Sequence, residues 1–591
     1  MNPSPALSKL VDTLLGSMSL QEKAGQLFVA MAQVGNGGRL MTADDHHAIG
    51  GPTEDLLRSG ISHFTVMGPA EPLDIARWHN RVQQIAADAG SGIPITVSTD
   101  PRHGTVDNPA ASQSAIGFSR WPEPLGLAAT RDRELVAEHA HTMRRDLTAI
   151  GIRVLLGPML DLASEPRWAR TIGTLGATPE LVSDLGNAFI DALTGSDPTT
   201  SVAPMIKHFP GAGPQKDGED AHFPYGREQV YPGNFFEAHL KPFREALARG
   251  VTQVMPYYAL PAGLTRGHER IEEAGFAFNR QIITELLREE LGFNGIVCTD
   301  YGLVTDSTLL GAPRPACAWG VEHLDRHNRV LRILQAGCDQ LGGETCTDIV
   351  IDLVKTGRLS ESRLDESVAR VLTEKERLGL FAQRTVDIDT AAATIATPHQ
   401  HEQARRAQRS SVVVLHDHDV LPLTPTTRVY GEGIDASALK RVAQVVERPE
   451  DADVAIARID APFEERTVGF ENFFRAGSLD FPNDQLDRLD ALARHAPLLV
   501  DVYLDRPAVL KPVAERAAAL TVSFGSDDDA LLAVLTGSAE RTGRLPVEIP
   551  SSMDDVRSQH EDVPLASPSP SYAFGHGINS SPETSSLKDT D

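Results

Sequence analysis

Cysteine is scarce in this sequence: four cysteines occur among 591 residues. Cys298, Cys317, Cys338 and Cys346 have no spacing typical of metal ligands, and four thiols are too few to cross-link a chain of this length. We therefore expect neither a disulfide framework nor a cysteine-bound metal. A reduced chain is typical of the cytoplasm, where we expect this protein to act.

Long hydrophobic runs are also missing. No window approaches the roughly 18 consecutive apolar residues that a membrane-spanning helix needs. The first segment, MNPSPALSKLVDTLLGSMSLQEKAGQL, has no basic stretch followed by an apolar run of the kind found in secretory leaders. The sequence thus predicts no membrane association and no cleaved leader, in line with a cytoplasmic location.

Positive charge is in short supply as well. The chain has 55 lysines and arginines against 81 aspartates and glutamates, which gives a formal net charge of −26. A protein that binds nucleic acid or anionic lipid needs a concentrated basic face, so neither partner is expected. A small neutral ligand such as a sugar is compatible with this surface. The choice between monomer and homo-oligomer is left open.

Short apolar runs recur in the first two-thirds of the chain, each between amphipathic stretches, at residues 63–67, 94–100, 153–163, 202–208, 251–258 and 295–300. Near-continuous apolar strands separated by helices indicate a parallel sheet that is covered on both faces. Six or more such units favour a closed barrel over an open sheet. We predict an α/β fold in which residues 1–385 form a (β/α) barrel.

Two helices of this region have recognisable ends. Ser19 and Glu22 form a capping-box pattern, which predicts a helix that runs through LQEKAGQLF. Gly292 is expected to end a second helix, NRQIITELLREELGF. That helix presents one apolar face, made of Ile282, Ile283, Leu286, Leu287 and Leu291.

The last third of the chain repeats an α/β pattern. Its strand-like segments are SVVVLH, TRVYG, ADVAIARI, LLVDVYL and ALTVSFG. This pattern predicts a flavodoxin-like α/β sandwich over residues 401–576. Residues 386–400 lack periodicity and are predicted to be a linker. Residues 577–591 are rich in Ser, Thr and Pro and are predicted to be a disordered tail.

Polar side chains stand at the carboxyl ends of the predicted barrel strands. They are Asp100, Lys207, His208, Tyr258 and Asp300. Because a (β/α) barrel places its active site at the carboxyl ends of its strands, these side chains are expected to meet there. Their donor and acceptor groups suit the hydroxyls of a sugar.

Three segments are more specific than this pattern: KHFPGAGPQKDGEDAHF (207–223), GFNGIVCTDYGL (292–303) and APFEERTVGFENFFRAGSLDFP (461–482). With MSLQEKAGQL, EPRWAR, RTGRLPVEIP and AFGHGI, they resemble glycoside hydrolase family 3, and most of all its two-domain β-glucosidases. The resemblance runs from about residue 10 to 578. It implies a barrel followed by a sandwich, and a retaining β-glucosidase that hydrolyses small glycosides without a cofactor or metal.

The same resemblance assigns the two catalytic carboxyls. Asp300, at the end of an apolar strand, would attack the anomeric carbon and form a covalent glycosyl-enzyme. The alternative is that Asp300 caps a following helix. The acid/base would come from the second domain, where APFEERT offers Glu464 and Glu465. Glu464 is preferred, and Glu471 is a weaker third candidate.

Sugar-binding residues carry over at six positions. The family's Asp after an early strand, the Arg of its PRWGR-like run, its Lys-His pair and its Tyr fall on Asp100, Arg170, Lys207, His208 and Tyr258. Tyr301, which follows the nucleophile, is expected to stack on the apolar face of the sugar. The run reads PRWAR here, so Ala169 departs from the commoner glycine.

Alternatives remain at this point. Single-domain N-acetylglucosaminidases of the family use a histidine as acid/base, and Asp220-Ala221-His222 offers one here, while a β-xylosidase would differ only in the pocket floor. Gly431-x-Gly433-x-x-Ala436 after TRVYG resembles a dinucleotide fingerprint and would suit an oxidoreductase. A sugar-binding protein without activity is the remaining alternative. The run HDHD (416–419) could suggest metal, but a solvated turn explains it.

Overall fold

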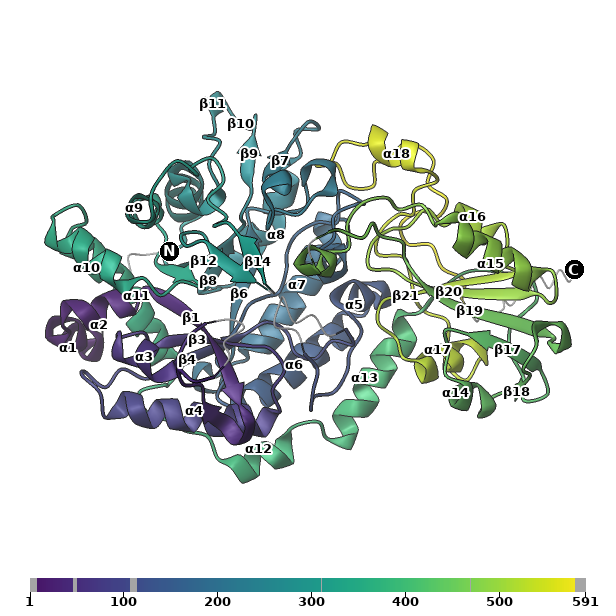
Figure 1. Ribbon diagram of the computed structural model, residues 1–591, viewed down its shortest axis with the longest axis horizontal. Coiled ribbons are helices and arrows are strands. Elements are labelled where there is room, and N and C mark those ends of the chain that lie inside the picture. The colour runs from purple at the N-terminus through teal and green to yellow at the C-terminus, as the bar shows by residue number, and fades with distance from the viewer. Residues whose placement is uncertain (1–7, 46–49, 107–113, 310, 468, 580–591) are drawn as a thin grey trace, which may run out of the picture.

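The computed structural model describes residues 8–45, 50–106, 114–309, 311–467 and 469–579. Within these ranges the chain forms two α/β domains, which lie side by side in Figure 1, with the first domain in purple to teal and the second mostly in green. None of the described helices combines the length and apolarity that crossing a membrane requires.

The first domain is a closed barrel. Its parallel strands among the described residues are β1 (Phe28–Gly35), β3 (His63–Met67), β4 (Thr96–Thr99), β5 (Val154–Leu155), β6 (Ala203–Phe209), β8 (Gln253–Pro256), β12 (Ile296–Tyr301) and β15 (Gln340–Gly342). Pairing of Phe28 with Leu341 and of Val29 with Gly342 joins the last strand to the first. A short strand, β2 (Arg39–Leu40), adds to β1 in the antiparallel sense. The predicted (β/α) barrel is confirmed.

The strands that close the barrel were not predicted from the sequence. The helix expected through LQEKAGQLF is α2 (Leu20–Gly25), and the chain then enters β1 at Phe28. Ser19 and Glu22 do form the capping box. A Cβ atom on Gly25 would lie 2.1 Å from the carbonyl oxygen of Gly60, so the end of the helix packs directly against another loop. This close approach is a tertiary contact that periodicity does not report.

Helices surround the barrel. The longer ones are α4 (Pro72–Ala87), α6 (Arg133–Ala149), α7 (Pro179–Thr194), α8 (Phe236–Ala248), α9 (Arg326–Ala336), α10 (Thr347–Lys355) and α11 (Glu361–Arg377). The apolar helix expected before Gly292 is a π-helix, η8 (Gln281–Glu290). It buries Ile282, Ile283, Leu286 and Leu287 as predicted, while Leu291 is only partly buried.

The second domain is a six-stranded sheet in the order β16-β21-β20-β19-β17-β18. The strands are β16 (Val413–Asp417), β17 (Arg428–Glu432), β18 (Gln444–Val445), β19 (Val454–Asp460), β20 (Leu498–Tyr503) and β21 (Ala519–Ser523). Strands β17 to β21 are parallel and follow the flavodoxin order 2-1-3-4-5. The first predicted strand, SVVVLH, is instead an antiparallel edge strand beside β21.

Helices cover both faces of this sheet. One face packs against α14 (Ala436–Lys440) and α17 (Asp528–Leu535), and the other against α15 (Asn483–Ala493) and α16 (Lys511–Ala514). The predicted flavodoxin-like sandwich is therefore confirmed. Of the predicted tail, residues 580–591 lie outside the described residues, and the Ile578 N–H donates to the Val414 carbonyl at 2.9 Å.

The connection between the domains is largely helical. Residues 386–400, predicted to be an irregular linker, contain α12 (Ile388–Thr394) and the start of α13 (Pro398–Ser411). Asp387 caps the first of these helices, which packs against α4 and α6. Thr397 and Gln400 form a capping box at the start of the second. Caps and docking onto the barrel supply the stability that a short helix lacks alone.

The two domains share part of one hydrophobic core. Helix α5 (Pro124–Thr130), which belongs to the barrel, places Leu125 and Ala129 in the apolar cluster of the second domain. Figure 1 shows α5 at the junction. Nearby, the Glu123 N–H donates to the Phe524 carbonyl at 2.9 Å. Residues after β19 and β20 line the mouth of the barrel, and this contact brings the end of β21 to the same side.

Candidate active site

A cavity of about 450 Å³ lies between the carboxyl ends of the barrel strands and the second domain. The barrel contributes seven of the predicted sugar-site residues to its wall, which are Asp100, Arg170, Lys207, His208, Tyr258, Asp300 and Tyr301. The second domain contributes Phe470, Phe473, Phe474, Arg475, Tyr503 and Asp505. Both domains are thus needed to build the cavity.

Asp300 is the next-to-last residue of β12 and is 8% exposed. Its Oδ1 accepts the N–H of Tyr301 at 2.8 Å. Among the described residues, its buried Oδ2 has no hydrogen-bond donor and lies 3.9 Å from Nε2 of His208. The chain continues as strand and then into the hairpin β13 (Ser307–Leu309) and β14 (Ala312–Arg314), so Asp300 caps no helix. One oxygen is therefore fixed, and the other is buried without a hydrogen-bond partner among the described residues.

Tyr258 holds the backbone next to Asp300. Its hydroxyl accepts the N–H of Tyr301 at 2.9 Å and donates to the carbonyl of Tyr301 at 2.8 Å. Arg314 donates to the same carbonyl at 3.1 Å. Burial, and then the nearby Asp300 carboxylate, raise the pKa of the Tyr258 phenol, which is therefore protonated and able to donate.

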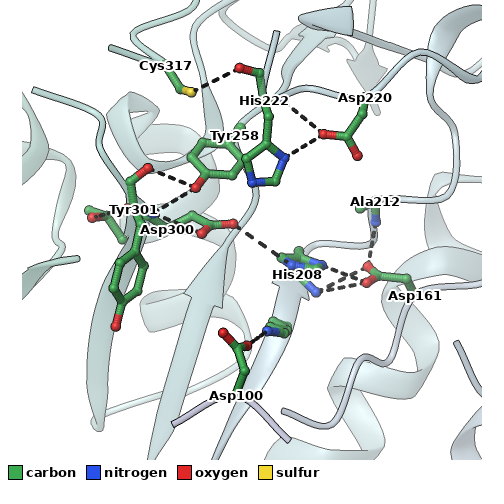
Figure 2. Close-up of polar contacts among 12 residues, drawn as sticks. Asp100, Asp161, His208, Ala212, Asp220, His222, Tyr258, Asp300, Tyr301 and Cys317 are labelled. Carbon is green, nitrogen blue, oxygen red and sulfur yellow. Dashed lines mark hydrogen bonds and ion pairs between the residues drawn. The ribbon is translucent and has the colours of Figure 1, made fainter. Parts of the chain in front are cut away.

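Tyr301 is anchored inside the barrel. Its hydroxyl is hydrogen-bonded to Thr65, and a Cβ atom on Gly342 would lie 2.8 Å from its ring. Figure 2 shows the ring pointing away from His222. Tyr301 lines the cavity, and the predicted stacking on a sugar remains a prediction.

Lys207 and Asp100 form a buried ion pair at the wall of the cavity. The Lys207 ammonium donates to Oδ1 of Asp100 at 2.8 Å. Each partner keeps spare capacity, because an ammonium has three protons and a carboxylate has two oxygens. The pair can therefore bind adjacent hydroxyls of one ligand without leaving a buried charge unpaired.

Arg170 follows Trp168 and Ala169 at a turn and is partly exposed to the cavity. Among the described residues, none makes a hydrogen bond or an ion pair with the guanidinium of Arg170. Burial lowers the pKa of Arg170, but the charges of Asp220, Tyr257, Asp300 and Asp161 raise it above its ordinary value. The result is a fixed positive charge with free donors facing the ligand space.

His208 is supported by Asp161, a residue that the sequence analysis missed. The His208 Nδ1 lies 2.8 Å from Oδ2 of this buried carboxyl, which also accepts the N–H of Ala212 at 2.7 Å (Figure 2). Burial and the charge of Arg170 lower the pKa of His208 well below its ordinary value, so its imidazole is neutral. An aspartate inside the apolar run RVLLGPMLDLA was a usable signal, because a buried carboxylate needs partners.

The candidate proton donors occupy different places. His222 lines the cavity, its Nδ1–H donates to Oδ1 of Asp220 at 2.5 Å, and its ring contacts the rings of Tyr258 and Phe474. Glu464 and Glu465 are exposed, and neither they nor Glu471 are among the described residues that line the cavity. The structure thus brings the sugar-site residues together with His222 and leaves the predicted glutamates on a neighbouring loop.

That loop, residues 461–482, is tied to the barrel. Arg466 forms an ion pair with Glu219 at 2.9 Å. The buried guanidinium of Arg506 donates to the carbonyls of Pro462 at 2.7 Å, Gly477 at 3.1 Å and, in the barrel, Arg167 at 3.0 Å. Sequence alone could not find the lining residues of this loop, because their position depends on how the two domains pack.

The two side motifs have structural explanations. A Cβ atom on Gly433 would lie 2.1 Å from the carbonyl oxygen of Arg458, and Gly433 has a φ of +70°, so packing and backbone shape require this glycine. In HDHD, His416 is hydrogen-bonded to the Tyr572 hydroxyl and the Ala517 carbonyl. The described residues contain no group of three or more side chains placed to hold a metal ion, and the four cysteines are buried and unpaired.

Comparison with known families covers both domains. Residues 19–374 match the family described as glycosyl hydrolase family 3 N terminal domain, and residues 382–580 match the family described as glycosyl hydrolase family 3 C-terminal domain.

Individual proteins give the same picture. The chain is 43% identical over 586 residues to "Beta-glucosidase C" of Emericella nidulans, across 98% of this chain and 93% of that protein. It is 35% identical to the "Periplasmic beta-glucosidase/beta-xylosidase" of Dickeya chrysanthemi, across 97% and 90% of the two chains. The crystal structure of a β-glucosidase from Listeria innocua in complex with isofagomine superposes with a TM-score of 0.75 at 21% identity, across 97% and 83%. At that identity the likeness shows the fold alone.

Proposed function

Since the chain belongs to glycosyl hydrolase family 3 and has both of the family's domains, we propose that it is a retaining β-glucosidase, which releases terminal β-D-glucosyl residues from small glycosides. It is a glycosidase, and so a hydrolase, of this family. The observation that carries the proposal is the Asp300 carboxylate, with one oxygen fixed by the Tyr301 N–H and the other unpaired at the cavity. The relatives named β-glucosidase support glucose as the sugar.

The proposed reaction uses two carboxyl groups. Oδ2 of Asp300 attacks the anomeric carbon, the glycosidic bond breaks, and the leaving oxygen takes a proton from the acid. Water then attacks the glycosyl-enzyme while the same group, now a base, removes a proton, and the ester to Asp300 breaks. Two inversions give net retention, and this chemistry needs no cofactor or metal. Asp100, Lys207, His208, Arg170 and Tyr258 would bind and orient the sugar.

We assign the acid/base to Glu464 or Glu465. A retaining enzyme needs a second carboxyl roughly 5–5.5 Å from the nucleophile, and these exposed glutamates lie on the loop whose later residues line the cavity. The test compares Glu464→Ala and Glu465→Ala, each serving as the control for the other. Azide should restore activity to only the variant that has lost the acid/base, and rescue of neither would contradict the assignment.

His222 supports a second candidate function, a β-N-acetylglucosaminidase with a histidine acid/base. Its position in the cavity and its hydrogen bond to Asp220 favour this alternative. Burial, however, lowers the pKa of His222, so the imidazole is neutral and lacks the proton that an acid must supply first. Turnover of aryl β-glucoside, β-xyloside and N-acetyl-β-glucosaminide separates glucosidase, xylosidase and glucosaminidase. A preference for the N-acetyl substrate that His222→Ala abolishes would favour the alternative.

Trapping with a 2-deoxy-2-fluoroglucoside followed by mass spectrometry of peptides tests the nucleophile. We expect one stable label, on the peptide that contains Asp300, and none on Asp300→Ala. That variant should lose at least about a thousandfold in kcat, since removal of a catalytic carboxyl costs several kcal/mol of transition-state stabilisation. A label on another carboxylate, or near-normal turnover by the variant, would contradict the proposal.

We also propose that the enzyme acts in the cytoplasm on small glycosides. The four buried, unpaired cysteines are compatible with a reducing compartment. Cell fractionation with antibody detection tests this location, and recovery of the protein outside the cytoplasm would reject it.

A further inference from the structure

A fully buried carboxyl lies behind the sugar-site histidine and takes no part in the two-carboxyl chemistry. Asp161 follows β5 and is 0% exposed. Its Oδ1 accepts the N–H of Ala212 at 2.7 Å and that of His208 at 3.1 Å. Its Oδ2 lies 3.2 Å from the same His208 N–H and 2.8 Å from Nδ1 of the His208 ring. Both oxygens of Asp161 therefore have hydrogen-bond partners, and the backbone partners are N–H donors.

The surrounding donors determine where the imidazole proton lies. Backbone N–H groups can only donate, and they favour the anionic form of the carboxyl that accepts them, although burial raises the pKa of Asp161 to about 6. At neutral pH Asp161 is therefore an anion. An anionic Asp161 can only accept, so Nδ1 of His208 must carry the proton of the neutral imidazole. Nε2, on the far side of the ring, is then left with a lone pair and no proton.

The choice of tautomer affects Asp300, because Nε2 of His208 faces its carboxylate. Nε2 lies 3.9 Å from Oδ2 of Asp300, the oxygen that has no donor among the described residues. An imidazole with a proton on Nε2 would place a partial positive charge near this oxygen, 3.9 Å away, and would lower its nucleophilicity. An imidazole with a bare Nε2 cannot do so, and it offers an acceptor to a hydroxyl of the sugar.

We propose that Asp161 is a positioning residue that keeps His208 in the Nδ1–H tautomer, so that Nε2 accepts a sugar hydroxyl and leaves the Asp300 oxygen free to attack. The inference rests on the proposed role of Asp300 as nucleophile. Asp161 itself does not touch the substrate and acts only through the ring of His208.

Neutron diffraction from crystals of the perdeuterated full-length enzyme tests the tautomer directly. We expect deuterium on Nδ1 of His208 and none on Nε2. Deuterium on Nε2 would overturn the inference even if the fluoroglucoside labels Asp300, so its failure is distinguishable from failure of the proposed function. Because the measurement uses the wild-type protein, it does not depend on whether any variant folds.

Asp161→Asn tests the functional consequence. The amide keeps an oxygen for the backbone donors but can present its NH₂ to Nδ1, which moves the ring proton to Nε2. We expect kcat and the rate of fluoroglucoside labelling to fall on the order of 100-fold. The loss should be smaller than the roughly 10⁴-fold caused by the wrong tautomer of a general-base histidine, because His208 transfers no proton in the proposed reaction. The neutron structure of the variant should show the proton on Nε2. Lost activity with the wild-type tautomer would show a merely structural role and would refute the inference.

Asp501→Asn is the matched control. Asp501 is also fully buried and accepts hydrogen bonds from Arg458, Thr521 and Ser523, but it lies within the second sheet and outside the cavity lining. The folded fraction of this variant should keep kcat within about twofold of wild type, because burial alone does not link a carboxyl to the reaction. An equal loss of kcat in both variants would attribute the effect of Asp161→Asn to stability and reject the positioning role.

Discussion

Tyr257 and Tyr258 are neighbours in sequence and both are buried, but their hydroxyls have different surroundings. The Tyr258 hydroxyl bridges the N–H and the carbonyl of Tyr301, next to the nucleophile. The Tyr257 hydroxyl lies beside the Trp168 indole without a hydrogen bond of normal geometry to any described residue. The sequence motif alone does not distinguish these two roles.

This contrast gives a prediction for Tyr258→Phe. Loss of the hydroxyl removes one of two hydrogen-bond partners from the N–H and from the carbonyl of Tyr301, which keep Asp300 and Arg314 as partners. The free energy of unfolding should therefore fall by about 0.5–1.5 kcal/mol. Asp300 should also be less well fixed, so kcat should fall about tenfold or more. Thermal unfolding and steady-state kinetics measure both effects. The matched variant Tyr257→Phe should change neither quantity much, and equal losses in the two variants would contradict the assigned role.

The acid limb of the pH profile is a second prediction at the residue scale. Burial raises the pKa of Asp161 to about 6, against an ordinary value of 3.8, while the N–H groups of Ala212 and His208 oppose the rise. Charged and titratable groups facing it are Arg170, His208, His239, Tyr231 and Tyr257. Below about pH 6 the carboxyl is protonated and no longer requires a proton on Nδ1 of His208. We therefore expect kcat/KM to fall with an apparent pKa near 6.

The raised pKa of Asp161 also affects how the stability of the protein depends on pH. Between about pH 4 and 6 the folded protein holds this proton and the unfolded chain does not, so Asp161 makes the free energy of unfolding decrease as pH rises. Above pH 6 the effect is complete. Asp161→Asn should lack this slope, so the unfolding free energy of the wild type minus that of the variant should decrease between about pH 4 and 6. If kcat/KM of Asp161→Asn still fell at low pH with the wild-type apparent pKa, the titration would belong to another group.

At the scale of elements, the buried guanidinium of Arg506 links the loop at residues 461–482 to a turn of the barrel. Arg506 donates to carbonyls of this loop, at Pro462 and Gly477, and to the carbonyl of Arg167 in the barrel. It therefore joins the loop that carries Glu464 and Glu465 to the PRWAR turn that carries Arg170. The proposed proton donor and a sugar-binding residue are positioned by the same side chain.

Arg506→Lys should uncouple these two elements. A lysine ammonium is a point charge and cannot match the planar fork of arginine, so at least one buried carbonyl should lose its donor. We expect the free energy of unfolding to fall by about 1–3 kcal/mol and kcat to fall about tenfold. Arg516→Lys, at a partly exposed arginine of the same domain that pairs with Asp490, is the control and should have little effect. Unchanged kcat in Arg506→Lys would exclude the coupling.

At the scale of the whole molecule, the docking of the two domains depends on α5, the barrel helix that enters the core of the second domain. Leu125 is 0% exposed and packs in the apolar cluster of that domain. Because the cavity is lined from both sides, undocking of the domains should dismantle it. Leu125→Asp places a carboxylate in this apolar contact, which should cost about 3–5 kcal/mol as an unpaired buried charge.

Calorimetry and kinetics of Leu125→Asp check this prediction. The expected result is a lower melting temperature, with the transition of the second domain separating from that of the barrel, and loss of most activity. Leu10→Asp, at a leucine that is 40% exposed, should leave both measurements close to wild type. A single unshifted transition with normal activity would show that docking through α5 is dispensable.

Several features followed from the sequence alone. Apolar runs of four to eight residues require burial on both faces, which fixes a parallel sheet whatever its neighbours are. Polar residues directly after those runs must meet at one end of a barrel, so Asp100, Lys207, His208, Tyr258 and Asp300 could be named before any coordinates. The two-domain plan came from the two strand patterns and from the motif resemblance, and the comparisons bear it out.

Other features were decided only by the tertiary structure. Strands β1 and β15 close the barrel. The sequence before β1 has a helical pattern that was expected to continue into the strand, and β15 has only three residues. Helix α12 is stabilised by docking onto α4 and α6, which its own composition does not predict. A role for Asp161 could be assigned only from its contacts with His208 and Ala212, which the fold brings together. Local pattern determines which residues must be buried or exposed, whereas contacts between distant segments depend on packing free energies that no single window of sequence contains.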